Sequence, residues 1–337
     1  MRWWLAMGLA VLMAGCEPDT DTDTDTDTDT DTETETETET ETGGETADVA
    51  PPYVRVLGSV QDGGLPHVAC ACSRCDAARA PGAPARHVAS LAVVLPGAVH
   101  LIDATPDFRA QLDALVDVRD APEDRVDRAP LDGILLTHAH LGHYTGLAFL
   151  GFEAVHAERV PVWATPAMNA LLRRNVPFSE LVRREEIVLH DAPPAARIEL
   201  GDGVSVTPVR VPHRDENADT VAFRITGPNA SVLYAPDTDN WETWDPPVEQ
   251  WLRQVDVALL DGTFFSEDEL PGRAVSSIGH PLISRSLERF APLADEVKIV
   301  FTHLNHSNPA LTPTSPERAR VEAAGMAIAR EGTSYAL

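Results

Sequence analysis

Residues 135–143 read Leu135-Leu136-Thr137-His138-Ala139-His140-Leu141-Gly142-His143, and three histidines fall within six of these positions. They follow the apolar run 131–136, which is typical of a buried strand leaving the core. Imidazoles at i, i+2 and i+5 converge on one point only if the segment turns sharply, as metal coordination requires. The alternative is three unrelated polar histidines in a loop, which leaves their clustering unexplained. The stretch therefore predicts a metal-binding loop at a strand end.

The chain beyond residue 51 alternates short apolar strands with helices. Strands are predicted over residues 53–58, 90–95, 99–102, 160–164, 187–190, 204–211, 221–225, 231–234, 257–260 and 298–301. Helices are predicted over 145–152, 166–175, 282–290 and 316–331, and one more begins at Thr105-Pro106-Asp107. Thr105 and Ser315 are the expected N-caps. Alternation without a long repeat predicts an α/β sandwich, in which candidate ligands follow strand ends.

The cysteines divide by position. Cys16 stands alone, whereas Cys70, Cys72 and Cys75 form a C-x-C-x-x-C cluster. Three clustered cysteines cannot all pair internally, and this spacing is too tight for a disulfide framework. Metal ligation is the better interpretation, and three buried thiols are the alternative.

The histidine stretch resembles the H-x-H-x-D-H motif of the metallo-β-lactamase superfamily, except that Gly142 stands where that family has aspartate. Further matches follow in the family's order at His213, Asp237, His280 and His303. The resemblance implies an αββα sandwich, with a single catalytic domain over residues 51–337. Within the superfamily, the cysteine cluster and segments 61–64, 211–216 and 301–306 look most like coenzyme PQQ biosynthesis protein B. They also look like the cyclic-phosphate phosphodiesterase of the carbon-phosphorus lyase pathway.

This resemblance implies two catalytic metals. The first is held by His138, His140 and His213, and Asp237 bridges to a second that is held by His143 and His303. Gly142 removes one ligand from the second site, so either water or substrate fills the position or the enzyme works with one metal. We expect an asymmetric dinuclear site, because both histidines remain. Imidazole and carboxylate ligands suit Zn²⁺, and ligand type alone also allows Mn²⁺ or Fe²⁺.

The same resemblance implies roles for two further histidines, and the positions of two aspartates at strand ends indicate roles for them. His280 resembles the general acid that protonates the leaving group, with a structural hydrogen bond at the helix entry as the alternative. His306 matches the fourth ligand that would complete a structural zinc site with Cys70, Cys72 and Cys75. Asp103 and Asp261 end strands beside the site, where carboxylates orient metal-bound imidazoles.

The first 50 residues predict an envelope lipoprotein. Residues 1–16 have one basic residue, an apolar run and small residues before a cysteine, which is typical of a secretory signal. Met13-Ala14-Gly15-Cys16 resembles a bacterial lipobox, with Cys16 as the lipidated residue and an ordinary signal as the alternative. Residues 17–50 repeat Asp-Thr and then Glu-Thr, which predicts a disordered acidic tether. The domain is therefore expected at the bacterial cell envelope, held to the membrane through lipid alone.

Charge disfavours nucleic acid as a partner. Residues 1–50 hold fifteen Asp or Glu against Arg2, which leaves −13 of the total charge of −27 on the rest of the chain, where Lys298 is the single lysine. Phosphate backbones are bound by clustered Lys and Arg.

The leading hypothesis is a metallo-hydrolase in which hydroxide on a metal attacks a phosphodiester or another ester of a small molecule. The alternatives are an iron-dependent oxidative enzyme like PQQ biosynthesis protein B and a non-catalytic relative with a degraded second metal site.

Overall fold

The computed structural model describes residues 50–83, 86–269, 272 and 279–337. These residues belong to one compact unit, residues 45–337. The predicted leader, and all but the last residue of the predicted tether, lie outside the described residues. A bilayer-spanning helix is absent from the described part of the chain, because none of its helices is long and apolar enough.

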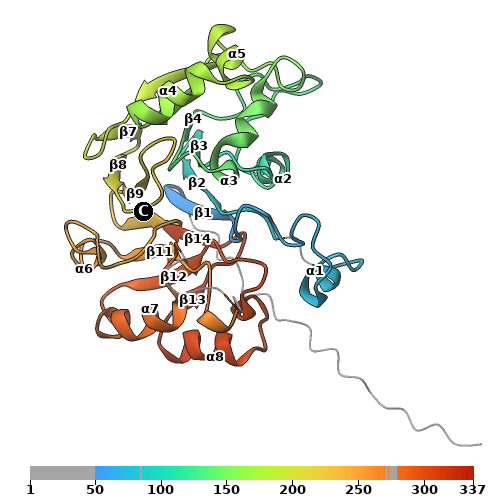
Figure 1. Cartoon of the computed structure of the whole chain (residues 1–337). Coiled ribbons are helices and arrows are strands. Elements are labelled where there is room, and N and C mark those ends of the chain that lie inside the picture. The colour runs from blue at the N-terminus through green and yellow to red at the C-terminus, as the bar shows by residue number, and fades with distance from the viewer. Residues whose placement is uncertain (1–49, 84–85, 270–271, 273–278) are drawn as a thin grey trace, which may run out of the picture. The chain divides into compact units, whose positions relative to one another are not determined.

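The described strands form two mixed sheets of seven strands each (Figure 1). The first runs in the order β14 (Ser334–Ala336), β1 (Tyr53–Gly58), β2 (Ser90–Leu95), β3 (Ala98–Ile102), β4 (Gly133–Leu135), β5 (Val160–Ala164), β6 (Ile187–Asp191). The second runs β13 (Ala327–Ile328), β12 (Lys298–Thr302), β11 (Val257–Asp261), β10 (Ser231–Ala235), β9 (Val221–Thr226), β8 (Val204–Arg210), β7 (Ile198–Gly201).

Both faces of each sheet are buried, because the central strands are apolar at nearly every position. Strands β2 and β10 are buried along their whole length. Leu91 of β2 and Tyr234 of β10 belong to the apolar cluster between the sheets. Their neighbours Ala92 and Leu233 belong to the clusters on the two outer faces. Side chains alternate between the faces of a strand, so each sheet needs a second layer over its outer face.

Helices supply these outer layers. Those whose residues pack on the first sheet are α2 (Phe108–Asp113), α3 (Leu141–Tyr144), α4 (Pro166–Arg174) and α5 (Phe178–Arg183). Those on the second sheet are α6 (Val248–Leu252), α7 (Ile283–Phe290) and α8 (Pro316–Ala323). Helix α1 (Ser73–Ala78) carries Cys75, and 3-10 turns cover η1 (Thr145–Leu150), η2 (Glu267–Glu269), η4 (Ala291–Leu293) and η5 (Pro309–Leu311). The αββα sandwich predicted from the sequence is confirmed.

The helix boundaries differ from the prediction in three places. Helix α8 begins as predicted, with the Ser315 hydroxyl accepting from the Arg318 N–H at 3.0 Å. It ends at Ala323 instead of residue 331, because Gly325 adopts a φ of +73° that ends the helix and leads into β13. Thr105 does not cap α2, which begins at Phe108 after a turn. The predicted helix 145–152 is instead α3 followed by η1.

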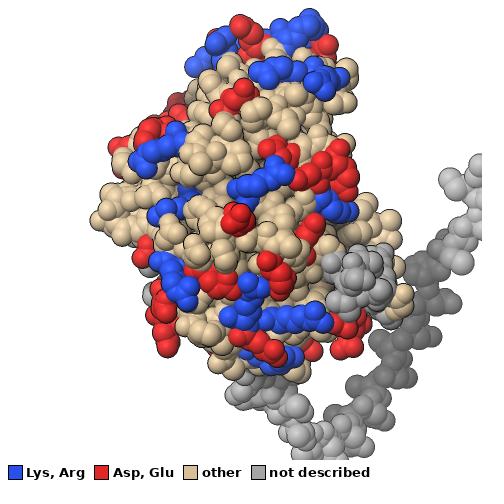
Figure 2. All heavy atoms as spheres, turned by 60° about the vertical axis from the view of Figure 1, so that its left-hand side comes forward, with Lys and Arg blue, Asp and Glu red and all other residues tan. Residues whose placement is uncertain are grey.

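The surface carries charges of both signs. On the face that Figure 2 shows, Lys and Arg side chains are interspersed with Asp and Glu side chains. Several charged side chains of the domain form ion pairs, such as Arg289 with Glu249 at 2.7 Å and Arg119 with Asp127 at 2.8 Å.

Candidate metal centre

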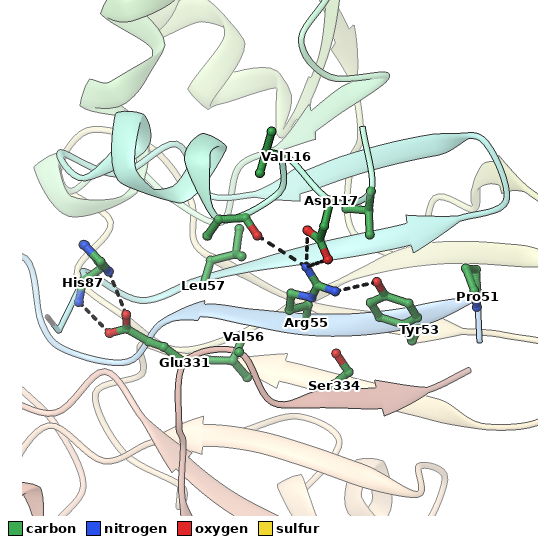
Figure 3. Close-up of a pocket in the computed structure, with 13 residues that line it drawn as sticks. Pro51, Tyr53, Arg55, Val56, Leu57, His87, Val116, Asp117, Glu331 and Ser334 are labelled. Carbon is green, nitrogen blue, oxygen red and sulfur yellow. Dashed lines mark hydrogen bonds and ion pairs between the residues drawn. The ribbon is translucent and has the colours of Figure 1, made fainter. Parts of the chain in front are cut away.

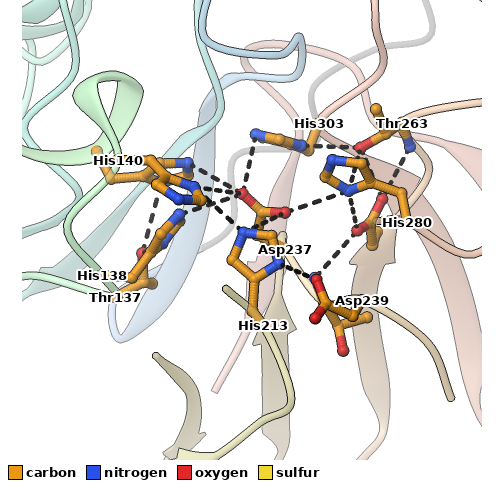
Figure 4. A network of polar contacts seen from close by, with 12 residues as sticks. Thr137, His138, His140, His213, Asp237, Asp239, Thr263, His280 and His303 are labelled. Carbon is orange, nitrogen blue, oxygen red and sulfur yellow. Dashed lines mark hydrogen bonds and ion pairs between the residues drawn. The ribbon is translucent and has the colours of Figure 1, made fainter. Parts of the chain in front are cut away.

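The ends of six strands from both sheets meet at one edge of the sandwich, and each carries a polar side chain into the same space (Figure 4). The first sheet supplies Asp103 after β3 and His138 and His140 after β4. The second supplies His213 after β8, Asp237 after β10, Asp261 at the end of β11 and His303 after β12. The placement follows from the fold, because strands that are buried on both faces release polar side chains only where they end.

Asp237 lies at the centre of this space, buried and surrounded by imidazoles. Six histidine side chains place a ring nitrogen within 3.9 Å of its carboxylate: His138, His213 and His280 at 3.2 Å, His143 and His303 at 3.7 Å, and His140 at 3.9 Å. The histidines contact both carboxylate oxygens. His213 and His280 face Oδ1, whereas the other four face Oδ2.

The donor atoms fall into three overlapping or neighbouring groups, one of which joins Asp237, His280 and His303. In the first, the ligand atoms of His138, His140, His213 and Asp237 lie within 4.8 Å of one another. In the second, those of His143 and His303 lie equally close to a carboxylate oxygen of Asp62. The structure thus brings together every residue that the sequence placed at the catalytic metals. Asp62 was not among them.

Donor atoms from the first two groups face inward without hydrogen-bond partners among the described residues. Five donor atoms are buried and make no hydrogen bond within the described part of the chain: Asp62 Oδ1, His138 Nε2, His143 Nε2, Asp237 Oδ1 and His303 Nε2. Leaving a buried polar atom unpaired costs about 1–3 kcal/mol. Convergent imidazole nitrogens and carboxylate oxygens are ligands for divalent cations. The residues therefore fit a metal ion.

The outward nitrogens of the rings are held in place by hydrogen-bonding partners. His143 Nδ1 lies 2.8 Å from Asp103 Oδ2, and the Thr137 N–H donates to Asp103 Oδ1 at 2.8 Å. Asp103 thus lies where the sequence predicted. His213 Nδ1 lies 3.0 Å from Asp239 Oδ1, and His303 Nδ1 lies 3.0 Å from the Thr263 hydroxyl. Each contact turns Nε2 toward the centre.

His280 lies at the rim of the site, with its side chain 8% exposed. Its Nδ1 is 2.9 Å from Asp261 Oδ2 and 3.2 Å from Asp237 Oδ1. Burial disfavours the charged imidazole, but the two carboxylates outweigh it and raise the pKa of His280 to about 9. Asp261 itself accepts from the backbone N–H of Thr238. It therefore orients His280.

Protonation differs among the groups around the centre. Burial, and then the charge of His143, holds the pKa of His138 well below its ordinary value, so its Nε2 carries a lone pair. Burial opposes ionisation of Asp62, but its contacts with His143 and His303 outweigh that cost and lower the pKa of Asp62. A neutral imidazole and an ionised carboxylate are the forms that bind metals.

The cysteine cluster forms a separate group beside this centre. The sulfur atoms of Cys70, Cys72 and Cys75 lie within 4.8 Å of one another and of a His306 ring nitrogen. The three cysteines are free thiols. The backbone N–H of Cys75 lowers the pKa of Cys72, which favours its thiolate. The structure brings together the four residues that the sequence assigned to structural zinc.

Comparison with known proteins places the chain in a family. Its sequence matches the profile described as the beta-lactamase superfamily domain over residues 100–304. The chain belongs to the metallo-β-lactamase superfamily. Within that superfamily, coenzyme PQQ synthesis protein B of Cupriavidus necator (strain H16) is 30% identical over 316 residues, covering 84% of this chain and 99% of that protein. The protein of the same name from Methylorubrum populi is 30% identical over 312 residues, covering 85% and 100%.

Two crystal structures of superfamily members extend the comparison. Zn²⁺-bound PqqB from Methylobacterium extorquens has a TM-score of 0.72 and 28% identity, covering 85% of this chain and all of that chain. A diphosphatase from the PhnP family has a TM-score of 0.60 and 25% identity, covering 84% and 96%. The chain thus spans nearly the full length of both.

Asp62 is the residue of this centre that the sequence prediction did not include. It follows β1 in the turn Gln61-Asp62-Gly63-Gly64, a segment that contributed to the family resemblance but was given no ligand role. Asp239 and Thr263 were missed too. The signal that could have found Asp62 is its place after a strand end, which it shares with the predicted ligands. Asp239 lies two residues after Asp237 and Thr263 two after β11, so neither had a motif of its own.

Proposed function

We propose that this protein is a metal-dependent hydrolase of a small-molecule phosphodiester or a related ester. The observation that carries the proposal is the position of Asp237, whose Oδ2 faces His138 and His140 of the first group of donors and His143 and His303 of the second, while its Oδ1 faces His213. A carboxylate between two ligand sets is the arrangement that supports a pair of divalent cations.

The ligand sets follow from the two groups. His138, His140 and His213 would hold one ion, His143 and His303 would hold the other, and Asp237 would face both. When bound, two such ions would supply an activated water and polarise a phosphoryl oxygen. The donor chemistry favours zinc, and manganese and iron are compatible with the same ligands.

His280 supplies a proton in this proposal. Its Nδ1 is held by Asp261 at 2.9 Å, which leaves Nε2 as the atom that donates to the leaving oxygen. The oxygen of water adds to phosphorus as water loses one proton, the bond from phosphorus to the leaving oxygen breaks, and the His280 proton moves to that oxygen. The proton lost by water is released to solvent, and a proton from solvent then restores His280. Against the opposing effect of burial, Asp261 raises the pKa of His280, which favours the protonated form that the acid needs before the reaction begins.

A second candidate function is an oxidative step like that of PQQ synthesis protein B. The full-length similarity to that protein, at 30% identity, supports it. Iron in the same ligand set would serve such a reaction. The leader predicted for residues 1–16 favours hydrolysis, because cofactor synthesis is normally cytoplasmic.

One assay separates the candidates. Metal-stripped protein is supplied with zinc, manganese or iron in turn, and both hydrolysis of bis(p-nitrophenyl) phosphate and oxygen consumption are measured. The proposal expects hydrolysis with zinc or manganese that is abolished in Asp237→Asn and kept in the control Asp113→Asn, an exposed aspartate. Oxygen consumption with iron and no hydrolysis supports the oxidative function. The absence of both hydrolysis and oxygen consumption with every metal supports a non-catalytic relative.

The cysteine cluster has a structural role in the same proposal. Cys70, Cys72, Cys75 and His306 provide the closed tetrahedral set that structural zinc requires. His306 lies three residues after His303, so the chain segment that follows β12 serves both metal sites. The expected effect of zinc at the cysteine cluster is to fix the position of His303.

We further propose that the domain is anchored to the cell envelope through lipid on Cys16. The support is the Met13-Ala14-Gly15-Cys16 sequence and the acidic repeat that follows it. Metabolic labelling with a fatty acid, in wild-type protein and in Cys16→Ala, tests this. Label in the wild type alone is expected, and equal label in both would reject the anchor.

A further inference from the structure

Gly142 is the one departure from the superfamily motif, and the structure shows what occupies the space beside it. A Cβ atom added to Gly142 would lie 2.2 Å from Asp62 Oδ1 and 2.6 Å from Asp62 Cγ. Contacts this short do not occur between real side chains. The carboxylate of Asp62 therefore fills the volume that an aspartate at position 142 would enter.

The Asp62 carboxylate also faces the correct partners. Its Oδ1 lies 3.5 Å from His143 Nε2 and 3.4 Å from His303 Nε2. All three atoms are buried and lack a hydrogen bond to any described residue. A carboxylate that only stabilised the turn would hydrogen-bond to it, whereas this oxygen faces two imidazole nitrogens that also face Asp237 Oδ2, each at 3.7 Å. The arrangement is that of three ligands around one cation.

The turn that carries Asp62 is fixed to the segment that carries His303. The Gln61 N–H donates to the Leu304 carbonyl at 2.9 Å, and the Leu304 N–H donates to the Ser59 carbonyl at 2.9 Å. Gly64 closes the turn with a φ of +73°, which favours glycine. These backbone bonds hold Asp62 and His303 in register, as rigid ligands of one ion require.

We infer that Asp62 is a ligand of the second catalytic ion and replaces the aspartate that the superfamily motif carries at position 142. The inference rests on the proposed pair of ions. It makes the second site complete, with Asp62, His143, His303 and Asp237 as its donors, where the sequence indicated a missing ligand. The exchange is reciprocal: the Asp62 carboxylate fits only because residue 142 has no side chain.

The test measures metal ions per chain by mass spectrometry, in full-length protein purified without chelator. Asp62→Asn and Asp62→Gly are compared with the control variants Asp113→Asn and Asp113→Gly, and circular dichroism checks folding. The double variant Asp62→Gly with Gly142→Asp moves the carboxylate to the motif position. We expect the two single variants at position 62 to lose about one ion per chain, the controls to lose none, and the double variant to regain it.

Full metal content in both folded Asp62 variants would overturn the inference. A folded double variant that holds no more metal than Asp62→Gly would overturn the exchange of positions. Because the readout is metal content, it is independent of the proposed reaction. Wild-type protein that binds both ions yet hydrolyses no ester would defeat the proposed function and leave the role of Asp62 intact.

Discussion

His143 Nδ1 lies 2.8 Å from Asp103 Oδ2, and neither side chain has any exposed surface. This pair joins the end of β3 to the histidine loop and fixes the ring so that Nε2 faces the centre. We predict that Asp103→Asn lowers the affinity of the second ion by roughly 10–100-fold, because the partner of a ligand ring sets its orientation and basicity. Competition with a chromogenic chelator measures this. Unchanged affinity in a folded variant would show that Asp103 only supports the loop.

His280→Gln tests the proposed acid. The expected loss is roughly 10²–10⁴-fold for esters with poor leaving groups and much smaller for p-nitrophenyl esters, whose leaving group needs no proton. The wild-type rate on poor leaving groups should fall as pH rises through about 9, because the acid acts only while protonated. The exposed His190 provides the control variant His190→Gln. Equal losses on both kinds of ester would remove His280 from proton transfer.

Cys72→Ser tests the cysteine cluster. Serine is a poor zinc ligand, so the variant should lose one zinc per chain and melt at a lower temperature than the wild type. Added zinc should restore hydrolysis only in part, because His303 and His306 share one segment. Ser73→Ala, next in the chain and exposed, is the control. Unchanged zinc content in Cys72→Ser would exclude the cluster as a metal site.

His87 and Glu331 provide a pH-dependent contribution to stability away from the metals (Figure 3). His87 Nδ1 lies 2.7 Å from Glu331 Oε2, and this contact raises the pKa of His87 above its ordinary value, against an opposing effect of burial. The stability it contributes is present in full below the unfolded pKa of about 6.5 and is lost as pH rises through the higher folded pKa.

Glu331→Gln should therefore destabilise the protein more at pH 6 than at pH 9. The expected difference is about 0.5–1 kcal/mol, because the pair is partly exposed to solvent. Thermal melts of both proteins at the two pH values measure it, and His87→Gln serves as the reciprocal variant. An equal effect at both pH values would show that charge on His87 contributes nothing.

The sequence predicted most of the strands and all the histidines of the site, because both depend on local patterns. Apolar runs such as 231–234 mark strands that are buried on both faces, and polar residues after them mark the site. The position of Asp62 after a strand end was the one local signal for it, and its contact with His143, 81 positions away, appears only in the folded chain. From the sequence, Gly142 indicated only that a ligand was lost. The sequence shows that residue 142 has no side chain, but it does not show which distant residue occupies the space beside it.

The prediction from sequence also missed strands at the edges of the two sheets. Strands β13 and β14 are short, and they form only by pairing with β12 and β1, which are distant in the sequence. The run from 316 to 331 has helical composition, and its one strong break is Gly325. Residues 327–328 form a strand instead of continuing the helix because they pair with β12.

The central claim is that Asp237 lies between two bound ions. The most direct measurement is the number of metal ions per chain in protein purified without chelator, compared between wild type and Asp237→Asn. We predict about two ions beyond the one at the cysteine cluster in the wild type, and the loss of at least one of them in Asp237→Asn. A wild-type protein with no more than one ion beyond the cysteine cluster would contradict the paired site.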